Sequence, residues 1–493
     1  MPTPILPFPI SEHLLPNRLK VIVVPTGLPD VVSLQIPVQT GSRNEIEPRK
    51  TGFAHFFEHM MFRGTETYPP EKYQKVLTLA GARTNAYTSD DYTNYHATFS
   101  RADLERILEI EADRFQHLQY GEEDFKTEAR AVLGEYNKNS ADPTEQLFEA
   151  MRDHAFTTHT YKHTTMGFLR DIEDMPNQFD YSRLFFDRWY RPEYTTLIVA
   201  GDVTAGAVLP LVERYWGGWQ TGSYRAEIPA EPAPAHSVYA HVRWDTPTLP
   251  WVTTSFHAPA FSATDRRYAA TDLVVDLWFG RSSELYRRLV DTEQVVDQLV
   301  AINPGNVDPG LITIAARVKE ARDALPVRDA LLDTARAART TIVSARRLAE
   351  AKSNMRYAFV RELDDTESIA ATLARFVHYD RTTQTLEDLF ASYAQVTPRD
   401  LRDAARATFT DAGLVITTLS HEDLPGAMAA PASLVAPPRR ARSRQPLALV
   451  QQVTPHPALD VKLLFTVGSA HDPAGKEGLA ALTAAIIADG GSR

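Results

Sequence analysis

Two histidines and a glutamate interrupt an otherwise apolar stretch near the start of the chain, "GFAHFFEHMMFRG" at residues 52–64. The apolar residues recur at helical spacing, so the stretch is predicted to be a helix. On that helix His55 and His59 lie one above the other, and Glu58 lies at the edge of the same face. This arrangement suits a metal ion and a water molecule.

The pattern fits a catalytic zinc site, which has three protein ligands and keeps one position for water. His55 and His59 supply two nitrogen ligands from one rigid helix. Glu58 is better placed as the general base that takes a proton from the water. The chain has no cysteine, so His, Asp or Glu must hold any metal, and disulfides are excluded. The alternative is that this arrangement of His and Glu arose by chance, but the inverted motif H-x-x-E-H is itself known as a catalytic pattern.

A third ligand is to be sought in "EARAVLGEYNKN" at residues 128–139. Glu128 and Glu135 are seven residues apart, which on a helix is two turns along one face. Considered alone, this segment is better interpreted as a charged surface helix, because amphipathic helices carry many glutamates.

Composition excludes several classes of protein. The formal net charge of −11 argues against nucleic acid as a partner. No stretch approaches the roughly 18 consecutive apolar residues of a membrane span. The first residues, "MPTPILPFPISEHLLPN", lack the basic and apolar regions of a secretory signal. The cytoplasm is therefore the default expectation, with the periplasm left open.

A chain of 493 residues is too long for one core and predicts several domains. The Pro/Ala-rich segment "AEIPAEPAPAHS" at 226–237 reads as a domain boundary, and a second Pro/Arg-rich linker follows near residue 430. The predicted organisation is a zinc-binding domain, a similar non-catalytic domain, a linker and a truncated repeat, at residues 10–228, 238–425, 426–448 and 449–493 respectively.

The last segment is interpreted as an internal repeat. "VKLLFTVGSAHDPAGKEGLAALTAAI" at 461–486 is similar to residues 32–61, with a strand, Gly-Ser, a polar loop and an apolar helix. Alanines 481, 484 and 485 take the places of the two histidines and the glutamate. The alternative is a C-terminal extension whose similarity to residues 32–61 does not come from an internal repeat.

Taken together, these motifs resemble the pitrilysin/insulinase family of zinc metallopeptidases. Between His59 and Glu135 there are 75 residues, one fewer than is usual in that family. "NAYTSDDYTNY" at 85–95 is similar to the family's paired strands, and residues 161–175 and 185–203 match further family segments, although Tyr194 stands where asparagine is common. The resemblance implies an α+β fold of repeated two-layer domains, each a mostly antiparallel sheet packed against helices, forming half of a clam-shell peptidase.

The resemblance also implies a role for each residue. His55, His59 and Glu135 would bind one zinc ion per chain, and Glu58 would activate water. Glu128 would be a nearby carboxylate that orients the site.

A peptide or unfolded polypeptide is the substrate that the resemblance implies. The segment Asn85, Ala86 and Tyr87 would bind it as an added β-strand. Because main-chain hydrogen bonds do not depend on which side chains the substrate carries, the preference for particular substrate residues would be weak.

In the family, the second half usually supplies an arginine and a tyrosine that grip the substrate. In the matching segment "ELYRRLVDTEQVVDQLV" at 284–300, Val290 and Asp297 take those positions. A second half-chain or a homodimer is therefore expected to complete the chamber. The alternative function is a non-catalytic scaffold or peptide-capturing subunit of the same family.

One other histidine pair has helical spacing. In "HTYKH", His159 and His163 are four residues apart, but they lack an acid between them. A Thr-rich, irregular stretch surrounds them, so a metal site is not expected there.

Overall fold

The computed structural model describes residues 4–430, 433–434, 472, 478–481 and 483–484. The chain divides into two compact units, residues 1–439 and 440–493. The elements below all lie in the first unit. Most of the predicted truncated repeat at 449–493, and most of the predicted linker at 426–448, lie outside the described residues.

A six-stranded sheet forms from the N-terminal strands, in the order β1-β2-β6-β3-β5-β4. Its neighbours are antiparallel except for the parallel pair β2 and β6. The strands are β1 (Ser11–Leu14), β2 (Lys20–Pro25), β3 (Val31–Val38), β4 (Arg83–Thr88), β5 (Thr93–Ser100) and β6 (Thr196–Gly201). The accompanying helices are α1 (Phe53–Met60), α2 (Pro70–Leu79), α3 (Leu104–His117), α4 (Glu122–Asn139), α5 (Pro143–Ala155), α6 (Leu169–Asp174), α7 (Phe179–Trp189) and α8 (Ala205–Trp216).

A five-stranded sheet follows, in the order β7-β11-β8-β10-β9, again antiparallel except for one pair, β7 and β11. The strands are β7 (Val238–Arg243), β8 (Trp251–His257), β9 (Val296–Ile302), β10 (Leu311–Val318) and β11 (Leu414–Ser420). The helices are α9 (Arg266–Phe279), α10 (Glu284–Tyr286), the π-helix η7 (Arg287–Thr292), α11 (Ala324–Thr340), α12 (Ala345–Arg361), α13 (Thr366–Asp380), α14 (Gln384–Gln395) and α15 (Pro398–Thr408). The short 3-10 helices are η1 (Ser42–Asn44), η2 (Met61–Arg63), η3 (Arg101–Asp103), η4 (Thr160–Lys162), η5 (Met175–Asn177), η6 (Pro192–Tyr194), η8 (Ala321–Asp323) and η9 (Gly426–Ala429).

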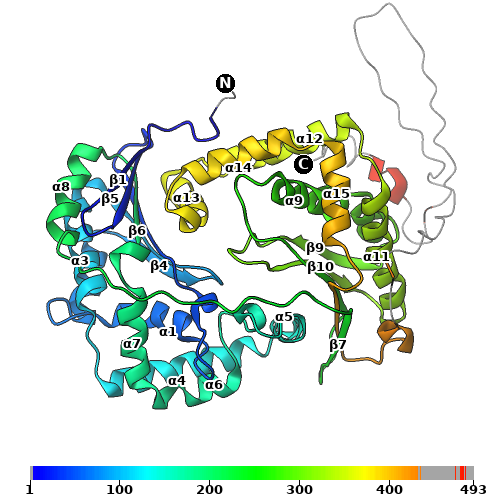
Figure 1. Cartoon of the computed structure of the whole chain (residues 1–493), viewed down its shortest axis with the longest axis horizontal. Coiled ribbons are helices and arrows are strands. Elements are labelled where there is room, and N and C mark those ends of the chain that lie inside the picture. Colours follow the sequence, from blue (N-terminus) through cyan, green and yellow to red (C-terminus); the bar gives the residue numbers. More distant parts are fainter. Residues whose placement is uncertain (1–3, 431–432, 435–471, 473–477, 482, 485–493) are drawn as a thin grey trace, which may run out of the picture. The chain divides into compact units, whose positions relative to one another are not determined.

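The predicted α+β class is confirmed: two mostly antiparallel sheets are each packed against helices (Figure 1). The domain limits predicted at 10–228 and 238–425 remain predictions.

Both faces of the first sheet are buried. In β2, Val21 and Val23 face the main core, whereas Ile22 and Val24 face the other way. That second face is covered by α13, through residues such as Leu373, although α13 lies far along the chain, after the second sheet's strand β10. An uninterrupted apolar strand is what burial on two faces requires.

The second sheet is covered in a reciprocal way. One face packs against α9, α11 and α15, which belong to the same half of the chain. The other face packs against α5, where Met151 meets Leu311 and Val415, and Leu147 meets Leu419. Figure 1 shows α13 beside the sheet of β6 and α5 beside β7. We call α5 and α13 the exchanged helices, because each covers the sheet that is formed by the other part of the chain.

Candidate metal centre

The helix α1 is fixed by its aromatic side. Phe53, Phe56 and Phe57 are fully buried in the core of the first sheet, and the rings of Phe57 and Phe185 stack at 5.5 Å. The helical period then directs the side chains of His55 and His59 to the opposite side, where α4 lies.

The start of α1 is fixed by its backbone. Gly52 has φ of 89°, and a Cβ atom there would lie 2.3 Å from the side chain of Ile172. The Glu45 carboxylate accepts hydrogen bonds from the N–H groups of Gly52 and Ala54, both at 2.7 Å. Burial raises the pKa of Glu45 to about 8. These bonds satisfy N–H groups that have no partner within the helix and hold α1 in place.

Three predicted ligands meet between α1 and α4. Glu135 Oε2 lies 3.3 Å from His59 Nε2 and 3.7 Å from His55 Nε2. Ligand atoms of all three residues lie within 4.8 Å of one another. Atoms bound to one tetrahedral zinc ion at 2.0–2.1 Å would be about 3.4 Å apart. The donor set and its spacing therefore fit a zinc ion, and the residues present can hold it with one position left for water.

The protonation of His55 suits a metal ligand. Burial, together with the neighbouring His59, lowers the pKa of His55 to about 4. The imidazole is then neutral near pH 7 and has a free lone pair for a metal ion.

Two charged side chains, Glu128 and Arg63, lie on the Nδ1 side of the His59 ring. Its Nδ1 lies 3.1 Å from Glu128 Oε1, and Arg63 Nε donates to Glu128 Oε2 at 2.6 Å. Burial favours the neutral form of Glu128, but the hydrogen bonds from His59 and Arg63 outweigh it and lower the pKa of that carboxyl. A carboxylate that accepts from Nδ1 leaves Nε2 of His59 free to face Glu135.

Glu58 is held apart from these ligands. Thr88 Oγ1, at the end of β4, donates to Glu58 Oε2 at 2.8 Å. Burial raises the pKa of Glu58 above its usual value. A more basic carboxylate beside a metal site is what a general base for water requires.

The predicted substrate edge is a free sheet edge in the described part of the chain. Asn85, Ala86 and Tyr87 lie in β4, which is the last strand of its sheet and pairs with β5 on one side. The side chain of Asn85 is exposed, whereas Ala86 is buried. The outer N–H and C=O groups of β4 can therefore accept another strand.

Other sequence candidates lie elsewhere. His159 Nε2 contacts Asp308, and His163 Nδ1 contacts the carbonyl of Thr164. Across the described residues, His55, His59 and Glu135 are the one group that could hold a metal. Asp297, in the second sheet, is paired with Arg317 at 2.8 Å.

Sequence reasoning missed three supporting residues: Arg63, Thr88 and Glu45. Arg63 lies one helical turn beyond His59, which is a detectable signal. Thr88 lies two residues beyond Ala86, so it points to the same side of the strand. Glu45 carries no such periodic signal, because a loop brings it to the helix start.

The sequence of this chain is similar to those of known protein families and proteins. The profile of the family described as "Insulinase (Peptidase family M16)" matches residues 21–168, and the profile "Peptidase M16 inactive domain" matches residues 179–355. Zinc protease PqqE of Helicobacter pylori is 27% identical over 406 residues, which are 80% of this chain and 89% of that protein.

Solved structures of proteases have a similar fold. The crystal structure of a protease from Helicobacter pylori superposes with a TM-score of 0.76 and 26% identity, over 83% of this chain and 99% of that one. The first half of the periplasmic protease PqqL from Escherichia coli shares the fold with a TM-score of 0.70 and 20% identity, over 86% of this chain and 95% of that one. None of the described helices is both long and apolar enough to cross a bilayer.

Proposed function

Since this chain belongs to the insulinase family, peptidase family M16, we propose that it is a zinc-dependent endopeptidase that hydrolyses peptides or unfolded polypeptide segments. The observation that carries the proposal is the convergence of His55, His59 and Glu135 within 4.8 Å, with Glu58 on the same helix but held apart by Thr88. A structural metal site would have no use for the additional base.

In this proposal His55, His59 and Glu135 hold one zinc ion per chain. When bound, zinc supplies a Lewis acid that polarises the peptide carbonyl and makes water more acidic. Glu58 accepts the proton that the attacking water loses and delivers a proton to the departing amine, so that one water molecule is consumed per bond broken. Glu128 keeps the ring of His59 oriented through its Nδ1.

We propose that the substrate lies along β4. Its backbone would pair with Asn85, Ala86 and Tyr87 as an additional strand of the first sheet. Only an extended segment can bind in this way, which selects unfolded polypeptides over folded proteins.

A second half completes the proposed chamber. Val290 and Asp297 stand where a substrate-gripping arginine and tyrosine are expected, so another half-chain or a second copy would supply them. The match to the first half of PqqL supports this arrangement. That relative is named a periplasmic protease, and the proposal fits the cytoplasm and the periplasm equally.

A peptide-capturing subunit without turnover is the alternative function. It is favoured by the match of residues 179–355 to the profile named "inactive domain". Such a subunit would bind peptide and zinc but would need a partner for hydrolysis.

The test is cleavage of an unstructured, quenched fluorogenic peptide by the full chain with stoichiometric zinc. Glu58→Gln should keep zinc and lose turnover. Glu123→Gln, which changes an 88% exposed carboxylate on α4, is the matched control and should cleave like the parent chain. Zinc bound by all three proteins without any cleavage would favour the capturing subunit.

A further inference from the structure

The turn between β4 and β5 lies directly beyond the residue that holds the general base. Thr88 ends β4 and donates to Glu58, and residues 89–92 then reverse the chain into β5. The N–H of Ser89 donates to the carbonyl of Tyr92 at 2.8 Å and closes the turn. A displacement of this turn would therefore move Thr88 and, with it, the carboxylate of Glu58.

One side of the turn is packed against the loop that precedes α1. A Cβ atom on Gly41 would lie 2.4 Å from the carbonyl oxygens of Ser89 and Asp90, so only glycine permits this approach. The N–H of Arg43 donates to the carbonyl of Asp90 at 2.8 Å, and Ser42 Oγ donates to its carboxylate at 3.1 Å.

The exchanged helix α5 binds the same turn. Arg152 donates two hydrogen bonds to the Asp90 carboxylate, at 2.7 and 2.9 Å. This paired geometry fixes both the position and the orientation of the carboxylate.

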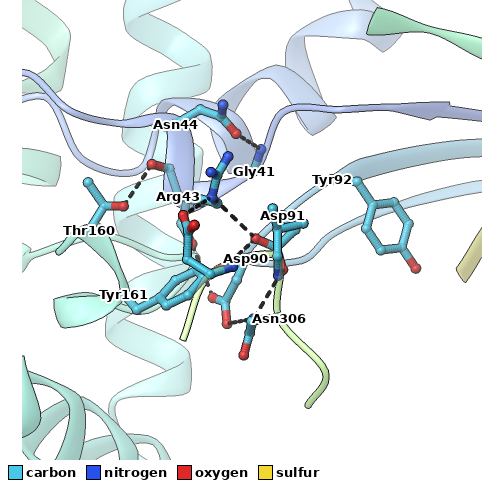
Figure 2. A network of polar contacts seen from close by, with 12 residues as sticks. Gly41, Arg43, Asn44, Asp90, Asp91, Tyr92, Thr160, Tyr161 and Asn306 are labelled. Carbon is cyan, nitrogen blue, oxygen red and sulfur yellow. Dashed lines mark hydrogen bonds and ion pairs between the residues drawn. The ribbon is translucent and has the colours of Figure 1, made fainter. Parts of the chain in front are cut away.

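The remaining side is held by the loop between β9 and β10, which belongs to the second sheet. Asn306 Nδ2 donates to Asp91 at 3.1 Å and to Asp90 at 3.3 Å, and the N–H of Val307 donates to Asp91 at 3.1 Å. Figure 2 shows Asp90 and Asp91 between Arg43 on one side and Asn306 on the other. Asn306 is thus the side chain of the second sheet's loop that reaches both carboxylates.

Asp91 depends on these neutral donors. Tyr161 donates to its Oδ1 at 2.6 Å, while Arg43 Nε lies 3.9 Å away, beyond hydrogen-bond distance. Asp91 is 8% exposed, and burial raises its pKa to about 6. Without Asn306, the Oδ2 atom of Asp91 would keep only the N–H of Val307 as a donor. A buried carboxylate with fewer donors is less stable where it is, which favours a shift toward water or another donor.

We propose that Asn306 is a positioning residue for the hydrolysis reaction. It joins the second sheet's loop to turn 89–92 and thereby keeps Thr88 in place to hold Glu58. This inference rests on the proposed peptidase function. Through Asn306, the part of the chain that forms the second sheet would help to position the general base, in addition to any contacts that it makes with substrate.

Asn303 offers a matched control in the same loop. Its Nδ2 donates at 3.1 Å to Asp272, which lies on α9 and is not part of the turn. Asn303→Ala therefore removes one amide-to-carboxylate hydrogen bond from the same loop without touching Asp90 or Asp91.

The experiment compares kcat, KM and zinc content of the full chain carrying Asn306→Ala or Asn303→Ala. Asn306→Ala should lower kcat by about tenfold, because small misplacements of a general base cost rate steeply. Its KM should change less than kcat, since β4 stays paired with β5, and zinc should remain stoichiometric. Asn303→Ala should keep the parent kcat. Equal kcat values for the two variants would overturn the proposal.

A second readout does not depend on turnover. Hydrogen exchange of the amides at residues 88–92, followed by mass spectrometry, should be faster in Asn306→Ala than in Asn303→Ala. If the parent chain cleaves no peptide, the proposed function fails, but this exchange measurement still decides whether Asn306 fixes the turn. Identical exchange in both variants would refute the inference.

Discussion

Replacing Glu128 by glutamine should weaken zinc binding although none of the three proposed ligands is changed. Glu128 is 6% exposed, and its two oxygens have separate donors, His59 Nδ1 at 3.1 Å and Arg63 Nε at 2.6 Å. A glutamine side chain has one acceptor oxygen, and its amide nitrogen cannot accept from either donor. One of the two bonds must be lost.

The magnitude follows from which bond is lost. Arg63 makes the shorter contact and should keep the remaining oxygen, so His59 Nδ1 loses its partner. A hydrogen bond to a charged group contributes about 1.5–3 kcal/mol. Loss of a carboxylate behind a metal-bound histidine typically weakens metal affinity about 10–100-fold, or about 1.4–2.8 kcal/mol. The two ranges agree, and we expect a loss of this size for Glu128→Gln.

Competition against a chelator of known zinc affinity measures this loss directly. Glu123→Gln, on the same helix but exposed, should bind zinc within about twofold of the parent chain, as surface changes generally do. Glu128→Gln with the affinity of the Glu123→Gln control would refute the idea that Glu128 orients His59. Circular dichroism of both variants checks that the helix itself is intact.

Three further changes test other parts of the structure. Glu135→Ala should abolish stoichiometric zinc binding, and zinc retained at one ion per chain would exclude Glu135 as the third ligand. His378 is 5% exposed beside the rings of Tyr92 and Tyr379, at 4.2 and 3.9 Å, and burial lowers its pKa to about 3. In the unfolded chain His378 takes up a proton near pH 6.5, whereas in the folded chain it stays neutral. As the pH falls from about 6 to about 4, the free energy of unfolding of the parent should therefore fall relative to that of His378→Phe by about 1.4 kcal/mol per pH unit. A difference in the free energy of unfolding that does not change with pH across that range would contradict this prediction. A fragment of residues 1–228 should lack a cooperative thermal transition, because it has α5 but no second sheet for α5 to cover; a sharp transition by circular dichroism would show that the exchanged helices are dispensable.

Local pattern accounts for the parts of the site that lie on one element. The placement of His55, Glu58 and His59 follows from helical spacing within α1, and Glu128 and Glu135 lie two turns apart on α4. Choosing Glu135 over a surface role needed the family resemblance, since spacing alone does not say which face of α4 meets α1. The strand pair β4 and β5 was likewise expected from the similarity of residues 85–95 to the family's paired strands.

Contacts between distant segments were not predictable in this way. Asn306 lies in an ordinary loop, and nothing in its neighbourhood indicates that it meets Asp90 and Asp91 more than two hundred residues earlier. The apolar residues of α5 and α13 predict amphipathic helices, but periodicity does not say which sheet a helix will cover. The exchange of these helices is a property of the tertiary fold and carries no local signal.

The exchange of these helices also delays the completion of the first sheet's core during synthesis. The last strand of the first sheet ends at Gly201, whereas α13, which covers Ile22, Val24 and Ile198 of that sheet, begins at Thr366. At about 5–20 residues per second, a ribosome needs roughly 10–30 s to make the intervening chain. During this interval the sheet presents an open apolar face to its surroundings. The nascent chain is therefore an expected client of chaperones that bind such faces at the ribosome.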